Sequence, residues 1–451
     1  MKKIFKIGLM ISAVSGVCIS TSVSAQDFPK EREKHLYKLR EESSSAKTYN
    51  ISLQEAVDYA QENNKNLQQI KNNTLKALYG KVETIGNYLP KVTGTIDYSN
   101  SLKDINTDMG FTIPAASGTV GVQATQVIFN GNAIVGIILG KIGQMMAELN
   151  EENQASILKM SVAQAYYAVL LSEESRKILV RNIAFMRDLA EKTKSLADGG
   201  ALEQTDADQI QVQVSLVENM LKDADRNSVL AYSTLKIQMG LRNNDEIILT
   251  DSLEYLINSK NNLEIAATPY DIESDPAFML VRGNEDLAKK QRLTAVMNFL
   301  PTVAGFYRYT YNMVESPMNS LMSRPNLVGL QVNVPIFSGL QNTYKYKQAN
   351  VDYINARLNT ALLEDQMLIK EQQLRFNFRS ALEQYETQKQ NSSVAARVLS
   401  SVQLKYINGV KSSMEMTTAN SDYLRAQTDY ISAVSKVLQA RVELEQLLGT
   451  L

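Results

Sequence analysis

The sequence of 451 residues predicts a chain that combines long α-helices with four short transmembrane β-strands, built as a tandem duplication. Three observations predict this fold class. Helix-breaking residues are missing from long stretches, and four short segments alternate apolar and polar residues. In addition, the same landmarks recur about 210 residues further along the chain.

Proline and glycine are unevenly distributed, which predicts the long helices. No proline lies between Pro114 and Pro269 or after Pro335, and the 69 residues from Leu340 to Asn408 contain neither proline nor glycine. Such stretches, rich in Ala, Leu, Gln, Lys and Glu, favour uninterrupted helix. A helix of about 65 residues would be ~95 Å long, which is too long for a compact globular domain.

The C-terminal segment indicates what these helices pack against. Apolar and small residues are spaced alternately three and four apart, as in a heptad seam, and a second seam starts one residue on. Two adjacent seams predict a neighbouring helix on each side, although one broad apolar face on an ordinary bundle would give the same pattern. The first seam comprises Tyr423, Ala426, Tyr430, Ala433, Val437, Ala440, Leu444 and Leu447, and the second comprises Leu424, Ile431, Val434 and Leu438.

Landmarks that recur in the same order predict the duplication. Because a nearly constant offset rarely arises by chance, each repeat of ~200 residues is expected to run helix, strand, loop, strand, long helix, turn, helix. Asn87-Tyr88-Leu89-Pro90 recurs as Asn298-Phe299-Leu300-Pro301, Val120-Gly121-x-Gln123 as Val328-Gly329-x-Gln331, Ile128-Phe129-x-Gly131 as Ile336-Phe337-x-Gly339, and Gly200 with Asp206 as Gly409 with Glu415.

Four segments of about seven to ten residues alternate with period two, which is typical of transmembrane β-strands. A half-buried sheet of a soluble domain would alternate in the same way. Arg308 is the one basic residue expected on the polar side, where it points into a barrel lumen or else lies at the surface. The apolar positions are Val92, Gly94, Ile96 and Tyr98; Val120, Val122 and Ala124, with Gln126 breaking the pattern; Val303, Gly305, Tyr307, Tyr309 and Tyr311; and Val328, Leu330, Val332 and Val334.

Four strands cannot close a barrel, and an open sheet edge in lipid leaves backbone groups unpaired. Several chains must therefore pool their strands: two chains would give eight strands with a filled interior, and three would give twelve with a lumen. Residues 104–117 and 313–324 are expected to be loops at one barrel end. Because proline cannot continue a helix, the strand borders are predicted at Pro90 and Pro301, with the return to helix at Gly131 and Gly339.

Composition excludes several functions. The 47 basic and 48 acidic residues nearly cancel, which argues against nucleic-acid binding. A single His and a single Cys argue against a His/Cys metal site or a His-based catalytic triad. Neither G-x-x-x-x-G-K-[ST] nor G-x-G-x-x-G occurs, so the chain is expected to be no enzyme and to need no cofactor. After the N-terminus, no run of about 18 apolar residues predicts a membrane-spanning helix.

The N-terminus predicts export. Lys2, Lys3 and Lys6 precede an apolar stretch, and Val23-Ser24-Ala25 fits a cleavage site, so residues 1–25 are interpreted as a signal peptide rather than a membrane anchor. Cys18 would leave with it. The predicted organisation is signal peptide 1–25, charged N-terminal extension 26–50, first repeat 51–241, linker or equatorial segment 242–275, and second repeat 276–451.

Over residues 50–450 these landmarks resemble the TolC-like outer-membrane efflux proteins. The resemblance rests on Ile51-Ser52-Leu53-Gln54-Glu55-Ala56 before Asn63-Asn64, on the strand borders, and on Tyr406-x-x-Gly409-x-Lys411 before Glu415. It implies a homotrimer in which a 12-stranded β-barrel in outer-membrane lipid continues into a long α-helical barrel in the periplasm of a Gram-negative bacterium. Residues 26–50 and the apolar segment 134–139 depart from the family pattern.

The resemblance also implies a passive exit duct of a tripartite efflux or type I secretion system. A periplasmic adaptor (membrane fusion) protein would open it, and an inner-membrane RND or ABC-type pump would drive it. Two other interpretations stay open on the sequence, a periplasmic coiled-coil adaptor or scaffold and a secreted helical pore-former. Neither accounts for four alternating strands at repeat-equivalent positions.

Two turns are predicted to reverse the helical hairpins, because Gly and Asn supply the positive φ that a tight turn needs. By the resemblance these tips dock the adaptor, although they could be turns only. The tips are Ala197, Asp198, Gly199 and Gly200, and Ile407, Asn408, Gly409 and Val410.

A closed periplasmic aperture is implied two helical turns inside the tips. Glu415 would contribute to an acidic ring, in which three carboxylates repel, favour cations and raise each other's pKa. Tyr406 and Lys411 would help to hold the closed state. The family's second aperture acid falls on Thr418, so the ring is expected to be weaker, and Asp206 is either part of the aperture or a solvated surface acid.

Overall fold

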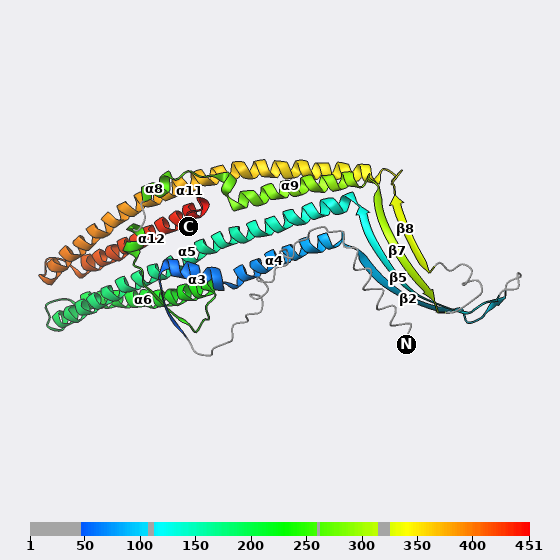
Figure 1. The fold of residues 1–451 in the computed structure, drawn as a ribbon. Coiled ribbons are helices and arrows are strands. Elements are labelled where there is room, and N and C mark those ends of the chain that lie inside the picture. The colour runs from blue at the N-terminus through cyan, green and yellow to red at the C-terminus, as the bar shows by residue number, and fades with distance from the viewer. Residues whose placement is uncertain (1–46, 107–111, 259–261, 314–324) are drawn as a thin grey trace. The chain divides into compact units, whose positions relative to one another are not determined.

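The computed structural model describes residues 47–106, 112–258, 262–313 and 325–451 (Figure 1). The predicted signal peptide and most of the predicted extension therefore lie outside the described residues. In chain order the elements are β1 (Thr48–Ile51), α3 (Leu53–Asn63), α4 (Lys65–Gly86), β2 (Lys91–Asn100), β3 (Ile105–Asn106), β4 (Thr112–Ile113), β5 (Ala116–Phe129), α5 (Gly131–Asp198), α6 (Gln204–Met239), β6 (Glu246–Leu249), α7 (Leu253–Asn258), α8 (Asn262–Ala267), η2 (Ile272–Ser274), α9 (Pro276–Met297), β7 (Thr302–Asn312), β8 (Asn326–Asn333), α11 (Gln341–Ile407) and α12 (Ser413–Leu447).

Both long helices expected from the proline and glycine distribution are present. α5 is 68 residues long and α11 is 67 residues long. Each turns back into a shorter partner, so that α5 packs along α6 and α11 packs along α12 (Figure 1). The prediction of uninterrupted helix is therefore confirmed, including the stretch from Leu340 to Asn408.

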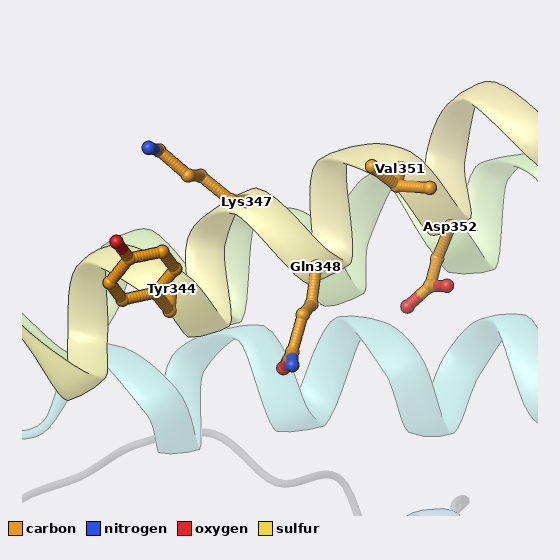
Figure 2. A pocket seen from close by; sticks show the side chains of 5 residues that line it. All are labelled: Tyr344, Lys347, Gln348, Val351 and Asp352. Carbon is orange, nitrogen blue, oxygen red and sulfur yellow. The ribbon is translucent and has the colours of Figure 1, made fainter.

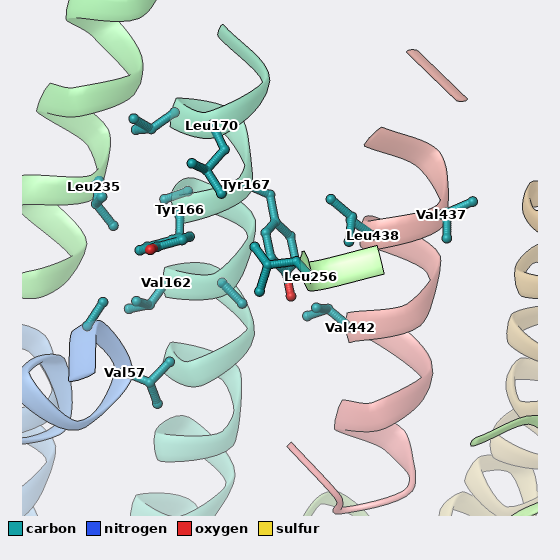
Figure 3. Packing of buried hydrophobic residues seen from close by; sticks show 14 of the residues in the cluster. Val57, Val162, Tyr166, Tyr167, Leu170, Leu235, Leu256, Val437, Leu438 and Val442 are labelled. Atoms are coloured by element: carbon teal, nitrogen blue, oxygen red, sulfur yellow. The ribbon is translucent and has the colours of Figure 1, made fainter. Parts of the chain in front are cut away.

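The hydrophobic core lies where the two hairpins meet. α12 contacts α11 on one side and α5 and α6 on the other, and residues of both C-terminal seams, such as Val437 and Leu438, are buried. Figure 3 shows Leu438 and Val442 of α12 close to Tyr167 of α5, with Leu256 of α7 between them. The structure therefore places neighbouring helices on both sides of α12, as the two seams predict.

The end of the predicted N-terminal extension is part of the fold. β1 pairs in parallel with β6, with Thr48 opposite Glu246 and Ile51 opposite Leu249. The predicted boundary between residues 50 and 51 falls inside this strand, because the sequence gives no sign of a partner almost 200 residues away. Directly after β1, Ser52 and Glu55 form a capping box that starts α3. The predicted linker 242–275 contains β6, α7, α8 and η2.

The four predicted strands form one antiparallel sheet in the order β2-β5-β7-β8. β5 pairs with β2 on one side and with β7 on the other, and β8 pairs with β7. The main elements follow the same order in the two halves of the chain, namely α4, β2, β5, α5, α6 and then α9, β7, β8, α11, α12, with β3 and β4 added between β2 and β5. The division into two repeats stays a prediction, and this order is what a duplication would produce.

The strand register separates apolar from polar side chains. Ile96, Val120 and Tyr311 lie opposite one another across β2, β5 and β7, whereas Thr93, Gln123 and Arg308 lie opposite one another on the other face. Period-two alternation also places Lys91 on this polar face, so Arg308 is not its only basic residue. Exposed apolar side chains of the first face are Val92, Ile96, Tyr98, Tyr307, Tyr311, Val328, Leu330 and Val332.

The predicted strand borders lie directly beside the strands and long helices. Pro90 immediately precedes β2 and Pro301 immediately precedes β7. Gly131 is the first residue of α5, and a Cβ there would lie 2.7 Å from Met297 Sδ, so a larger residue would force Met297 to shift. Gly339 instead has φ +59° with open space around it, so its backbone conformation favours glycine. The two glycines therefore act through different physical constraints.

Two sequence expectations near the strand ends need correction. β5 begins at Ala116, and β3 and β4 pair within the segment 104–117, so that segment is only partly loop; 313–324 lies almost entirely outside the described residues. Gln126, which breaks the apolar pattern, donates Nε2 hydrogen bonds to the carbonyl oxygens of Tyr88 (2.7 Å) and Val127 (2.8 Å). It therefore ties the base of the sheet to the turn that precedes β2.

One part of α5 is long and apolar enough to be a candidate membrane span, judged by length and composition alone. An 18-residue window reaches a mean hydropathy of 1.2, and 11% of that window is buried within the chain. This differs from the expectation that no such stretch follows the N-terminus. In the apolar segment 134–139, Val135 is buried while Ile134 and Ile138 are exposed, so one side of the segment packs within the chain and the other does not.

Candidate functional site

The candidate site is the end of the helical body where both hairpins reverse. At the first tip, Ala197 and Asp198 end α5, Gly199 follows as the C-cap, and Gly200 has φ +74°. The Ala201 amide donates a hydrogen bond to the Leu196 carbonyl (2.8 Å). The positive φ at the residue after the cap is the usual way to end a helix sharply, and the structure therefore places all four predicted residues in the first turn.

The second tip has the same construction. Ile407 ends α11, Asn408 is its C-cap, and Gly409 has φ +69°. The Val410 amide donates a hydrogen bond to the Lys405 carbonyl (2.8 Å), which is the equivalent of the bond at the first tip. Ile407 and Val410 are exposed, so this tip presents apolar side chains to its surroundings.

Lys411 and Glu415 organise the start of α12. Ser412 is the N-cap and Glu415 is the third helical residue, and the two form a capping box. The Lys411 ammonium forms an ion pair with Glu415. Hydrogen bonds from Lys411 and from the Ser412 backbone hold the pKa of the exposed Glu415 carboxyl below its usual value. Glu415 thus lies in the first turn of α12, five residues after Val410 of the second tip.

Asp206 links the two hairpins near their tips. It is the third residue of α6, and its carboxylate accepts a hydrogen bond from the Ser413 hydroxyl of α12. Ser413 is buried, and its Oγ also lies 3.1 Å from Gln209 Oε1. Asp206 is therefore bonded to the other hairpin, which a freely solvated surface acid would not be.

Tyr406 makes a second link between the hairpins. Its ring is buried among Met186 and Leu189 of α5 and Met416 of α12, and its hydroxyl lies 2.9 Å from Thr193 Oγ1. Thr193 is also buried. Thr418, by contrast, is exposed and donates its hydroxyl to the Met414 carbonyl within α12 (2.8 Å), so it takes no part in these links.

A third link lies deeper in the seam and was not identified from the sequence. Asn182 of α5 donates Nδ2 to Asn420 Oδ1 of α12 (2.7 Å), and both residues are buried. Asn182 Oδ1 and Asn420 Nδ2 have no partner among the described residues. Extending the second α12 seam by one four-residue step from Leu424 toward the N-terminus reaches Asn420, so a polar residue at a seam position was the available signal.

The hydrogen bonds near the tips join the two helical hairpins of one chain. Within one chain the links run from α5 to α11 through Thr193 and Tyr406, and from α6 to α12 through Asp206 and Ser413. Side-chain hydrogen bonds of this kind contribute about 0.5–1.5 kcal/mol each. Together these bonds favour one arrangement of the two hairpins.

The described residues contain no group of three or more His, Cys, Asp or Glu residues that could hold a metal ion. A surface depression of ≈300 Å³ lies on the first turns of α11 and is lined by residues of that single helix (Figure 2). Such an open groove does not enclose a ligand. Its lining residues are Tyr344, Lys347, Gln348, Val351 and Asp352.

The fold is similar to that of solved outer-membrane channels. With the *Campylobacter jejuni* CmeC outer membrane channel the TM-score is 0.74 at 15% identity, covering 88% of this chain and 85% of that one. With CusC, whose structure is described in terms of folding and transmembrane channel formation, the TM-score is 0.74 at 13% identity, covering 90% of this chain and 94% of that one.

Curated relatives and a family model agree with this fold. The chain is 21% identical to outer membrane protein TolC of *Vibrio cholerae* over 402 residues, 87% of this chain and 86% of that protein. It is 22% identical to outer membrane efflux protein BepC of *Brucella suis* over 365 residues, 78% of this chain and 74% of that protein. The family model described as "Outer membrane efflux protein" matches residues 56–241 and 272–450. The chain therefore belongs to the outer membrane efflux protein family and is an outer-membrane channel protein.

Proposed function

We propose that three copies of the chain form a passive exit duct that a periplasmic adaptor opens at the helical tips and an inner-membrane RND or ABC-type pump drives. The sheet carries this proposal. The outer edges of β2 and β8 pair with no strand among the described residues, and one face of the sheet exposes Val, Ile, Leu and Tyr side chains. In lipid, open strand edges are unfavourable because their backbone groups lack hydrogen-bond partners.

Closure through other copies satisfies both edges. β2 and β8 run in opposite directions in the sheet, so β8 of one copy and β2 of the next would pair antiparallel and continue the same pattern. Three copies supply twelve strands, which form a barrel with a lumen. Two copies would supply only eight strands, and side chains would fill the interior of that barrel. The exposed apolar face then meets lipid and the polar face lines the lumen.

The helical body also exposes apolar stripes that a neighbouring copy would cover. On α11 these residues lie on the side away from α9 at helical spacing, and α6 exposes a comparable set. A stripe of this length on one helix is typical of a packing surface rather than of scattered surface residues. The residues are Tyr344, Val351, Leu358, Leu362, Ile369 and Phe376 on α11 and Val212, Leu216, Leu230 and Ile237 on α6.

At the tips, Asp206, Tyr406, Lys411 and Glu415 are proposed to hold the aperture closed. The support is that Tyr406 and Asp206 join the two hairpins, while Lys411 and Glu415 fix the first turn of α12 between them. The two tip turns, 197–200 and 407–410, are proposed to dock the adaptor. Movement of one hairpin against the other would break the links and widen the aperture.

Disulfide cross-linking tests the trimer. The repeat places β7 211 residues after β2, and β8 208 residues after β5. The β5–β7 pair of Ala124 and Tyr307 therefore corresponds to Val332 in β8 of one copy and Ile96 in β2 of the next copy. Ile96→Cys with Val332→Cys should therefore give covalent trimers on oxidation, seen on a non-reducing gel. Ile96→Cys with Val328→Cys is the control, because four residues displace the pair by ~13 Å. Only monomers from the first pair would contradict the trimeric barrel.

The ion pair at the start of α12 should make that turn sensitive to acid. Because the folded pKa of Glu415 is below its usual value of 4.5, its stabilising contribution is present above that pH and is lost as pH falls through the folded pKa. Hydrogen exchange at the Glu415 and Met416 amides should accelerate, beyond the intrinsic change, between pH 6 and pH 3. Glu415→Gln should show no such pH dependence, and equal pH dependence in both proteins would contradict this role.

A further inference from the structure

We propose that Arg308 forms an anion-binding position on the channel wall, which takes the carboxylate, sulfonate or phosphate group of an exported organic anion. The inference deepens the proposed function and rests on it, since it requires the polar face of the sheet to line a water-filled lumen. It names a chemical class of cargo and the residue that would contact it.

Arg308 lies at mid-strand on the polar face. In β7 it is opposite Gln123 of β5 and Leu327 of β8, and Gln123 is in turn opposite Thr93 of β2. The side chain is exposed. Because Arg308 lies well inside β7, its guanidinium is far from both ends of the strand. A solute that moves along the polar face would therefore pass it.

Neighbouring side chains orient the guanidinium. Arg308 Nε donates to Gln123 Oε1 (2.9 Å), and Gln123 Nε2 donates to Thr125 Oγ1 (3.1 Å). The guanidinium carbon also lies 5.8 Å from the centre of the ring of Phe306, two residues before Arg308 in β7. The far end of the Phe306 ring lies against Gly329, where an added Cβ would be 2.4 Å from the ring's Cζ. The wall therefore holds the arginine stem and leaves the terminal nitrogens for a ligand.

Those terminal nitrogens form a fork that matches an oxyanion. Arginine has five N–H donors in a fixed planar arrangement, and the bond to Gln123 uses only the Nε donor. No ion pair joins Arg308 to another described residue. Because a planar guanidinium can bind carboxylate, sulfonate or phosphate with two parallel hydrogen bonds, the free edge of Arg308 is suited to these groups.

Other charges on the polar face leave this position electropositive. Lys91 lies at the base of β2 and donates to Asn87 Oδ1 (3.1 Å). Asp97 of β2 is opposite Thr119 of β5, and Thr119 is opposite Asn312 of β7. Asp97 is therefore level with Asn312, which is four residues from Arg308 along β7. That offset alone is ~13 Å, which exceeds the screening length of about 8 Å at physiological salt. Asp97 therefore does not neutralise Arg308.

Asp97 supplies a matched control of opposite sign. It follows Pro90 by seven residues, just as Arg308 follows Pro301 by seven, so the two residues occupy equivalent strand positions in the two halves. Neutralising Asp97 and neutralising Arg308 should change the electrostatic potential at the polar face in opposite directions. Each substitution removes one charge from the same face.

The test measures local potential with charged thiol reagents on the reconstituted trimer. Thr310→Cys places a thiol two residues from Arg308 on the same face, and the chain's single natural cysteine is Cys18. The rate ratio between a sulfonated and a trimethylammonium methanethiosulfonate should fall about threefold when Arg308→Gln is added. It should rise when Asp97→Asn is added instead, and Arg308→Lys should keep most of the preference.

Two results would decide against the proposal. An unchanged rate ratio after Arg308→Gln would overturn the anion position, as would a Thr310→Cys thiol that reacts with neither reagent. Tyr311→Cys on the apolar face should be protected by lipid from both. Failure of the proposed function shows itself separately, as the absence of covalent trimers from the Ile96→Cys and Val332→Cys pair.

Discussion

Efflux should be largely lost in a Gly409→Pro variant, while the trimer still assembles. Gly409 has φ +69°, whereas proline fixes φ near −65°. The substitution also removes the amide that donates to the Tyr406 carbonyl (2.9 Å). A strained proline of this kind costs ~3 kcal/mol or more, and here the cost falls on a turn that belongs to neither the sheet nor the packed seam. The tip should therefore lose its shape while the barrel remains.

Gly449→Pro is the matched control for this experiment. Gly449 also has positive φ (+68°) with open space around it, but it follows α12 at the end remote from the tips. Efflux would be followed as accumulation of an exported dye in cells, adaptor binding by co-purification, and assembly by the β2–β8 cross-link. Normal efflux and adaptor binding in Gly409→Pro would contradict the docking role of the second tip.

Combining Tyr406→Phe with Glu415→Ala should increase the conductance of the channel in planar bilayers. Phenylalanine keeps the buried ring among Met186, Leu189 and Met416 but removes the hydroxyl that lies 2.9 Å from Thr193 Oγ1. One hydrogen bond of about 1 kcal/mol corresponds to roughly a fivefold change in the ratio of closed to open states. Loss of Glu415 removes the partner of Lys411 and one half of the Ser412 capping box.

Two further variants separate this effect from a general loss of stability. Thr193→Val removes the same hydrogen bond from the other side and should increase conductance in the same direction. Tyr430→Phe removes a hydroxyl from the α12 seam beside Tyr385, far along the helix from the tip, and should leave conductance unchanged. A double variant that stays closed like the unmodified channel would contradict the aperture assignment.

Features set by neighbouring residues were predictable from the sequence. Alternation with period two placed the four strands, and proline placed the starts of β2 and β7, because these depend on the local backbone. The capping box of Ser412 and Glu415 and the ion pair with Lys411 also lie within one helical turn. By contrast, Thr193 is 213 residues from Tyr406, and Asn182 is 238 residues from Asn420.

Contacts between helices distant in sequence depend on how the helices rotate against each other. Heptad spacing shows which side of α12 is buried, but it does not show that Asn420 meets Asn182 or that Ser413 meets Asp206. The pairing of β1 with β6 has the same origin. A four-residue strand such as β1 is too short to show a recognisable apolar–polar alternation. The sequence therefore indicated that the extension, residues 26–50, was separate from the fold.

The position of β5 between β2 and β7 has a consequence for folding kinetics. β2 and β5 are close in sequence and can pair early, but the other edge of β5 waits for β7, with Gln123 and Arg308 separated by 185 residues. Pairings of such sequence separation form slowly, and an unpaired apolar strand edge is prone to aggregation in the meantime. We therefore expect the newly exported chain to depend on periplasmic chaperones until its second half arrives.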